Sequence, residues 1–216
     1  MKGELAIFWG GLKRALGKAA DLILLNFLVA LCCAPVVTAG ASWAAGYASL
    51  MRIARGEDQG MPLKPFFLDF RKTFRQATAA WLMLLLCLAI LAGDYYYAAY
   101  VASPVNRFFL VFSIALAAVL LSAATWLFPL IARYENALPA HIKNSFLMAV
   151  AALPRTAAAL AVQILFLALP LVFPDVFMYL GWIWVLWGFT LPMYLTVLMY
   201  RKRLGNEPRE KNPEED

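Results

Sequence analysis

The chain has 216 residues, is 63% hydrophobic and 15% charged, and carries a formal net charge of +6. Average soluble proteins are about 45–50% apolar and about 25% charged, and here the apolar excess is gathered in five uncharged runs, each of about 18 residues or more. Such runs exclude a water-soluble globular domain and predict an all-α, polytopic membrane helix bundle. The runs cover residues 22–51, 76–93, 108–132, 156–174 and 176–200.

The first predicted element is residues 1–16, where apolar side chains are mixed with Lys2, Lys13 and Arg14. We expect this segment to be amphipathic and to lie on the cytoplasmic face of the membrane, although its glycines weaken a helix. Apolar chain continues beyond Pro35 without a separate mature domain, so we expect no cleaved signal peptide.

The first uncharged run is too long for one crossing, because a helix over residues 22–51 would measure about 45 Å against a hydrocarbon core of about 30 Å. Pro35 disfavours a continuous helix, Thr38 is a candidate N-cap for a new helix, and Gly40 permits close helix packing. We therefore predict a break there and crossings at 17–34 and 38–54. A re-entrant hairpin that does not cross twice remains the alternative.

Four further crossings are predicted, which makes six. Of the 19 Lys and Arg residues, 18 lie in the N-terminal segment, the second and fourth connecting segments and the tail, so these parts and both termini are expected to be cytoplasmic. A single helix-bundle domain then spans residues 17–204, and the Pro- and Glu-rich tail, 205–216, is expected to be disordered. The four crossings are residues 76–97, 106–132, 149–173 and 177–200.

Two stretches resemble each other at an offset of 78–79 residues. Each leaves an inward-running helix, crosses a cytoplasmic loop and enters an outward-running helix, which predicts a parallel internal repeat. The repeat matches Arg55 and Glu57 with Arg133 and Glu135. An Arg at a helix C-terminus complements the dipole, so we interpret both pairs as structural tethers, with a gate or ligand contact as the alternative.

The stretch from Asn26 through the Ala-Pro-Val-Val-Thr-Ala-Gly segment at 34–40 resembles the YesL-like family of bacterial membrane proteins. The resemblance continues through Arg55-Gly56 and the segment 66–70, which contains Asp69 between phenylalanines. It implies a multi-pass protein of the bacterial cell membrane. The family has no known mechanism, but its members often occur beside carbohydrate-uptake systems, which implies a partner in a carbohydrate transporter complex.

The sequence bears on three classes of function. A non-enzymatic accessory or scaffold fits the scarcity of ionisable groups in the apolar runs. The alternative, a small permease or channel for a polar solute, needs polar groups near the midplane. The best candidate for such a site is Asn26 with the Pro35–Gly40 region, joined by the polar side chains of Ser122, Thr125 and Gln163. An enzyme is not expected, because the chain lacks a paired nucleophile and base. His141 has no Cys or His at ligand spacing, so no metal or other cofactor is expected.

Overall fold

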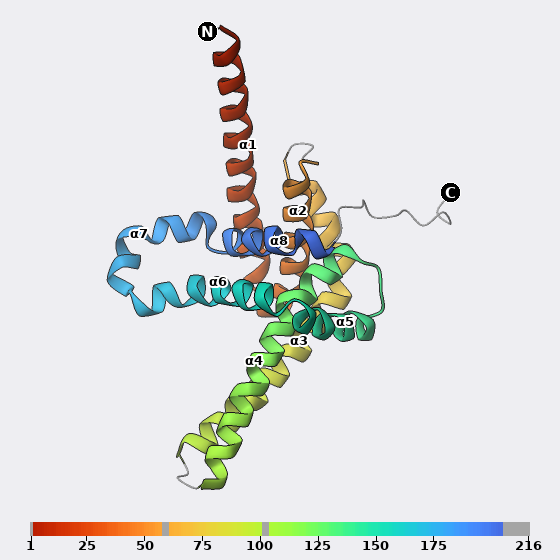
Figure 1. Cartoon of the computed structure of the whole chain (residues 1–216), viewed down its shortest axis with the longest axis vertical. Helices are drawn as coiled ribbons and strands as arrows, with labels where there is room; N and C mark the ends of the chain where they lie inside the picture. Colours follow the sequence, from red (N-terminus) through yellow and green to blue (C-terminus); the bar gives the residue numbers. More distant parts are fainter. Residues whose placement is uncertain (1, 58–60, 101–103, 205–216) are drawn as a thin grey trace.

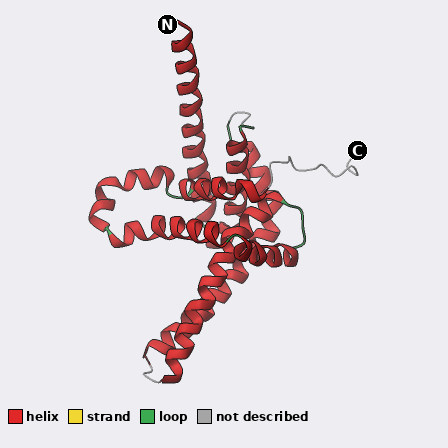
Figure 2. Cartoon of the chain, viewed as in Figure 1, coloured by secondary structure: helices red, strands yellow, loops and turns green. Residues whose placement is uncertain are grey.

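The chain folds entirely into helices in the computed structural model, which describes residues 2–57, 61–100 and 104–204 (Figure 2). Within these residues there are eight α-helices, one short 3₁₀ helix and no strand, which confirms the predicted all-α class. The elements in chain order are α1 (Lys2–Cys33), η1 (Val36–Thr38), α2 (Ala39–Arg55), α3 (Leu63–Tyr100), α4 (Pro104–Arg133), α5 (Leu138–Ala151), α6 (Leu153–Val172), α7 (Pro174–Trp187) and α8 (Thr190–Leu204).

The first four helices run up and down through a common centre (Figure 1). Helix α1 enters the centre from one end of the molecule, α2 returns toward that end, and α3 and α4 form a long hairpin that projects from the opposite end. Helices α6 and α8 run across this direction, joined by α7. Helix α1 and the α3–α4 hairpin therefore leave the centre in different directions, and α6 and α8 cross them (Figure 1).

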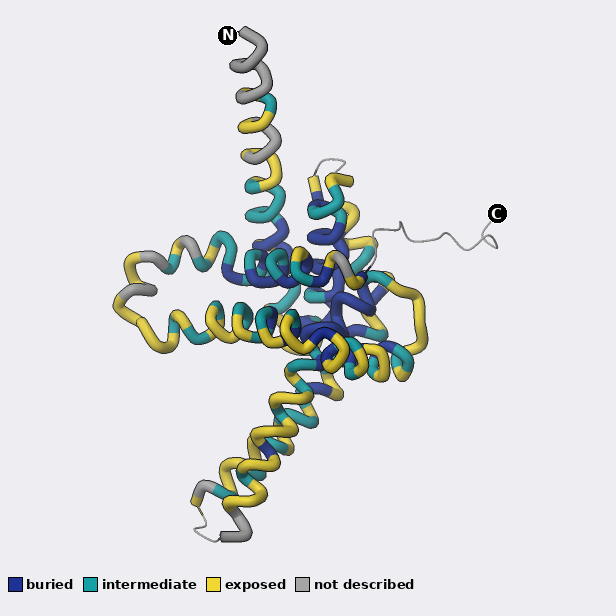
Figure 3. The backbone as a smooth tube through the Cα atoms, viewed as in Figure 1, coloured by how far each residue is buried: buried dark blue, intermediate teal, exposed yellow. Residues whose placement is uncertain are grey.

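Helix α2 occupies the centre because its sequence is rich in small residues, which let neighbouring backbones approach closely. Helices α1, α3, α4 and α8 all contact it, and most of its length is buried. The helix is followed by Gly56, whose φ of 75° gives the left-handed conformation common after a helix C-terminus. Burial is concentrated around α2, and the outer parts of α1, α3, α4 and α6 are largely exposed (Figure 3).

Four of the described helices are long and apolar enough to cross a membrane. They contain the segments Trp9–Cys33, Leu63–Ala98, Arg107–Arg133 and Leu153–Val172. These are features of an integral membrane protein, but they do not confirm six crossings. Helix α2 has only 17 residues, and the region predicted as the last crossing is divided between α7 and α8, of 14 and 15 residues.

Two predicted boundaries were wrong. Residues 177–200 do not form one helix, because the chain breaks between Trp187 and Thr190. A second break at Ala152, followed by Pro154, separates α5 from α6, so the crossing predicted from residue 149 begins later. Proline lacks an N–H and fits the first turn of a helix, which explains why α6 starts there.

The internal repeat is not confirmed. In its first copy α3 continues without interruption, whereas the second copy is divided into α5 and α6, and α6 runs across α3 (Figure 1). At the N-terminus, the described part of the interfacial segment predicted for residues 1–16 belongs to the same continuous helix, α1 (Lys2–Cys33), as most of the crossing predicted for 17–34. The predicted disordered tail, 205–216, lies outside the described residues.

Candidate functional site

The predicted break at Pro35 is present, and it separates α1 from α2 on the surface. The Thr38 hydroxyl donates to the carbonyl oxygens of Cys32, at 2.7 Å, and Pro35, at 3.0 Å. It makes no side-chain bond to the start of α2, so the prediction that Thr38 caps α2 was wrong. The hydroxyl instead bonds the Cys32 carbonyl, which lies at the end of α1, where helix carbonyls lack partners within the helix.

The turn is also held from α3. The indole Nε1 of Trp81 donates to the carbonyl oxygen of Val36 at 2.7 Å. Next to the turn, a Cβ on Gly40 would overlap the carbonyl oxygen of Ala77 and the Cβ of Trp81, so α2 and α3 touch backbone to backbone at this point. The expected close helix contact at Gly40 is therefore confirmed. The Ser42 hydroxyl donates to the Val29 carbonyl at 2.9 Å and joins α2 to α1.

Asn26 lies at the break between α7 and α8 and is 1% exposed. Its Oδ1 accepts hydrogen bonds from the backbone N–H groups of Phe189, at 2.9 Å, and Thr190, at 3.0 Å, and its Nδ2 donates to the carbonyl oxygen of Val185 at 2.7 Å. One side chain of α1 thus satisfies backbone groups on both sides of the break. The oxygen and the nitrogen of its amide are therefore both engaged at the break.

Charged residues at the end of α2 and the start of α3 form two ion pairs. Asp69 accepts from Arg52 at 2.5 Å, and this pair joins the two helices. Arg55 donates to Glu57 at 2.8 Å across the end of α2. Arg55 and Glu57 are thus in contact, and their role as a tether stays a prediction, whereas the pairing of Asp69 with Arg52 was not predicted.

The loop after α4 is fixed to two other elements. Glu135 pairs with Lys72 of α3, and the Gln76 side chain donates to the Asn136 carbonyl at 2.9 Å. The Tyr134 hydroxyl donates to the carbonyl oxygen of Leu204, at the end of α8, at 3.0 Å. The connecting segments predicted to be cytoplasmic therefore meet in one charged layer.

Arg133 is half-buried and is the last residue of α4, as Arg55 is of α2. Both arginines of the predicted pairs thus lie at helix–loop junctions. Glu57 pairs with the arginine of its own copy, and Glu135 contacts Lys72 of α3. Sequence reasoning missed Arg52 and Lys72, because nothing local marks which of many basic residues pairs across helices.

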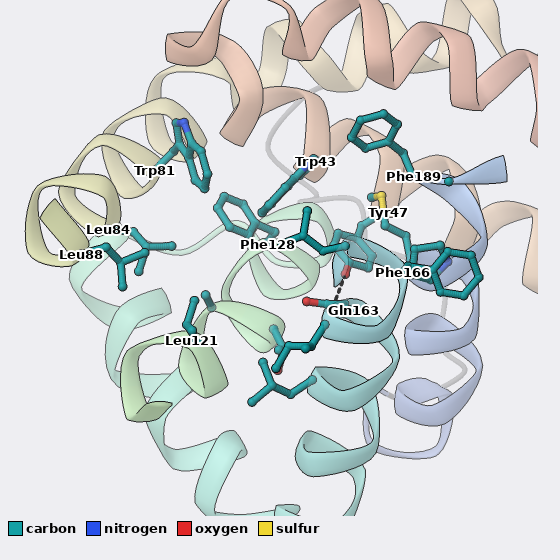
Figure 4. A pocket seen from close by; sticks show the side chains of 18 of the residues that line it. Trp43, Tyr47, Trp81, Leu84, Leu88, Leu121, Phe128, Gln163, Phe166 and Phe189 are labelled. Atoms are coloured by element: carbon teal, nitrogen blue, oxygen red, sulfur yellow. Dashed lines mark hydrogen bonds between the residues drawn. The ribbon is translucent and has the colours of Figure 1, made fainter. Parts of the chain in front are cut away.

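A cavity of about 300 Å³ lies between the α3–α4 hairpin and helices α6 and α8, over the middle of α2 (Figure 4). Aromatic rings form much of its wall. Trp43 packs edge-on against Trp81, with ring centroids 5.1 Å apart, and against Phe128, at 5.4 Å. The wall contains no Asp, Glu, Lys, Arg or His among the described residues.

Few polar side chains reach this cavity. Nε2 of Gln163 lies 3.4 Å from the hydroxyl oxygens of both Tyr47 and Thr196. Thr125 lies 2.8 Å from the Tyr200 hydroxyl and also donates to the Ser122 carbonyl. Of the four polar candidates for a permease, only Gln163 and Thr125 line the cavity.

The other two candidates do not form a polar path. Asn26 is engaged at the break, and Ser122 donates to the Ala118 carbonyl of its own helix at 2.7 Å. The described residues contain no group of three His, Cys, Asp or Glu side chains placed to hold a metal ion. The three cysteines, Cys32, Cys33 and Cys87, are unpaired.

Residues 22–95 match the family described as "Protein of unknown function, DUF624". The match covers the stretch on which the resemblance described above is most specific, and it supports an unknown-function membrane domain. The YesL-like name itself stays a prediction. No curated protein matches the chain. No solved structure matches it either.

Proposed function

We propose that the chain is a non-enzymatic, multi-pass protein of the bacterial cell membrane that acts as an accessory or scaffold, with both termini in the cytoplasm. The supporting observation is how the buried polar side chains are engaged. Asn26 bonds the break between α7 and α8, Ser42 bonds α1, and Trp126 donates to Thr156 at 2.8 Å. These contacts hold helices together, whereas a path for a polar solute requires polar groups that face a continuous opening.

The proposed orientation is supported by the charged layer. The ion pairs Arg52–Asp69 and Lys72–Glu135 bring together segments rich in Lys and Arg, and cytoplasmic loops carry such an excess. Exposed basic side chains on the first turns of α3, including Lys64 and Arg71, are placed to meet anionic lipid headgroups at the cytoplasmic surface. No nucleic-acid partner is proposed.

The proposed link to carbohydrate uptake, with a transporter complex as partner, depends on the family resemblance alone. Purification of the tagged chain in mild detergent, followed by mass spectrometry, tests it. We expect a carbohydrate-transporter subunit in near-equal amount, and none with an unrelated membrane protein that carries the same tag. Recovery of the chain without such a subunit would contradict the partner.

The competing function, a small permease, is tested separately in proteoliposomes. We expect vesicles that contain the purified chain to take up radiolabelled mono- and disaccharides no faster than protein-free vesicles. Saturable uptake that is abolished by Gln163→Leu would contradict the scaffold and favour a permease, because Gln163 is the amide that faces the cavity.

A further inference from the structure

We propose that the cavity between the α3–α4 hairpin and α6 binds a neutral lipid whose apolar chain carries one hydroxyl group, and that Gln163 Oε1 accepts a hydrogen bond from that hydroxyl. The proposal concerns a ligand site and stands independently of the scaffold role. The size of the cavity, about 300 Å³, falls at the lower end of the roughly 300–1,000 Å³ typical of small-molecule sites.

The orientation of the Gln163 amide follows from its neighbours. Thr196 donates its hydroxyl proton to the Pro192 carbonyl at 2.8 Å, so its oxygen is left as an acceptor. The Gln163 atom that faces Thr196 must therefore be the nitrogen. This argument resolves the usual ambiguity between the oxygen and nitrogen of an amide.

The carbonyl oxygen of the same amide points into the cavity (Figure 4). Oε1 of Gln163 has no hydrogen-bond partner among the described residues, although an acceptor in apolar surroundings is costly to leave unpaired. A ligand that supplies one O–H would satisfy it. A cationic donor is disfavoured, because no acidic side chain lines the wall.

The rest of the cavity wall indicates the chemistry of the part of the ligand that does not contact Gln163. Its surface is formed by the rings of Trp43, Trp81 and Phe128 and by aliphatic side chains, which suit an apolar chain. The lining residues Ile164 and Leu167 of α6 are 52% and 68% exposed, so the cavity is accessible beside α6. Helix α6 is apolar enough to cross a membrane, so this access would face lipid.

The test uses the full chain in nanodiscs of phosphatidylethanolamine and phosphatidylglycerol, photolabelled with a dodecanol that carries a diazirine in its chain. Labelled residues are mapped by mass spectrometry. Unlabelled 1-dodecanol and dodecyl methyl ether then compete for labelling; they share the alkyl chain, but only the alcohol has an O–H. We expect label on the cavity wall, and displacement by the alcohol at roughly three- to tenfold lower concentration than by the ether, the effect of one hydrogen bond.

Variants identify the acceptor. Gln163→Leu is expected to abolish the preference for the alcohol, whereas Gln76→Leu, at the surface against Asn136, is expected to keep it. Leu84→Trp places a larger side chain in the wall and should reduce cavity labelling several-fold. Equal competition by alcohol and ether in the unaltered chain would overturn the proposal whether or not the variants fold. Label confined to lipid-facing residues outside the cavity, or a preference that survives Gln163→Leu, would also overturn it.

Discussion

Oδ1 of Asn26 accepts the backbone N–H of Thr190 at 3.0 Å, so a side chain of the first helix caps the last helix. Thr190 is the first residue of α8 and is fully buried. A helix N-terminus leaves N–H groups without partners inside the helix, and burial prevents water from satisfying them. The contact therefore makes the break between α7 and α8 dependent on α1.

Replacing Asn26 with leucine tests this dependence. The change leaves the Phe189 and Thr190 N–H groups and the Val185 carbonyl without their partner, so we expect the free energy of unfolding to fall by at least about 2 kcal/mol. SDS-induced unfolding in detergent micelles measures it. Asn144→Ala, on the exposed side of α5, is the control and should change it by less than about 0.5 kcal/mol. Equal effects of the two substitutions would refute the capping role.

Gly40→Ala tests the contact between α2 and α3. The added methyl group collides with the Ala77 backbone, which cannot move as a flexible side chain would, so we expect a loss of about 1–3 kcal/mol. Gly93→Ala is the matched control in α3, because nothing lies within 4 Å of the added atom. It should leave stability unchanged or raise it by up to about 1 kcal/mol. The melting temperatures of the two variants in detergent should therefore move in opposite directions, or only that of Gly40→Ala should fall.

The sequence was informative where local chemistry determines structure. Pro35 blocks a continuous helix in any context, so the break was predictable, and so was the close contact at Gly40. The break between α7 and α8 also had a local signal, Gly188 followed by Pro192, but it was masked by an uncharged run long enough for one helix. The length of an uncharged run indicates how long a membrane helix could be, but it does not show where that helix is interrupted.

Long-range partners were not predictable from single residues. Asn26 and Thr190 are 164 positions apart, and Lys72 and Glu135 are 63 apart. Thr38 showed a different limit, because the residue type preferred at an N-cap also bonds carbonyls behind it, and only the backbone geometry decides between the two. Gln163 was noticed as polar, but its role at the cavity depends on Tyr47 and Thr196 of two other helices.

The ion pairs Arg52–Asp69 and Lys72–Glu135 of the charged layer should differ in strength. The Arg52 and Asp69 side chains are 29% and 16% exposed, whereas those of Lys72 and Glu135 are 51% and 54% exposed. Double-mutant cycles with alanine should give a coupling of about 1–2 kcal/mol for the first pair and below about 0.5 kcal/mol for the second, because solvent screens the more exposed charges. A larger coupling for Lys72–Glu135 would contradict this ranking.

His141 should make stability depend on pH. Its side chain is 1% exposed, and burial lowers its pKa below the ordinary 6.5. The backbone of Asn136 partly opposes this lowering of the pKa. Neither ring nitrogen makes a hydrogen bond to a described residue, so the effect of burial is the larger of the two. The folded state then binds a proton less readily than the unfolded state. Its contribution to stability is present above pH 6.5 and is lost as pH falls through the lowered pKa.

Thermal unfolding of the purified chain between pH 8 and pH 5 measures this loss. The melting temperature of the unaltered chain should fall more steeply with acidification than that of His141→Phe, which cannot titrate at this position. Parallel curves for the two proteins would show that His141 is not responsible.

The most direct test of the proposed membrane topology is to determine on which side of the membrane two exposed residues lie. These are Val36, at the Pro35 turn, and Met61, before α3. Each is replaced by cysteine in a chain whose Cys32, Cys33 and Cys87 are alanine, and intact cells are treated with an impermeant maleimide. We expect Val36→Cys to react from outside, and Met61→Cys to react only after permeabilisation. Reaction of Met61→Cys in intact cells would contradict the proposed cytoplasmic position of the charged layer. Reaction of Val36→Cys only after permeabilisation would favour the alternative in which α1 and α2 form a re-entrant hairpin.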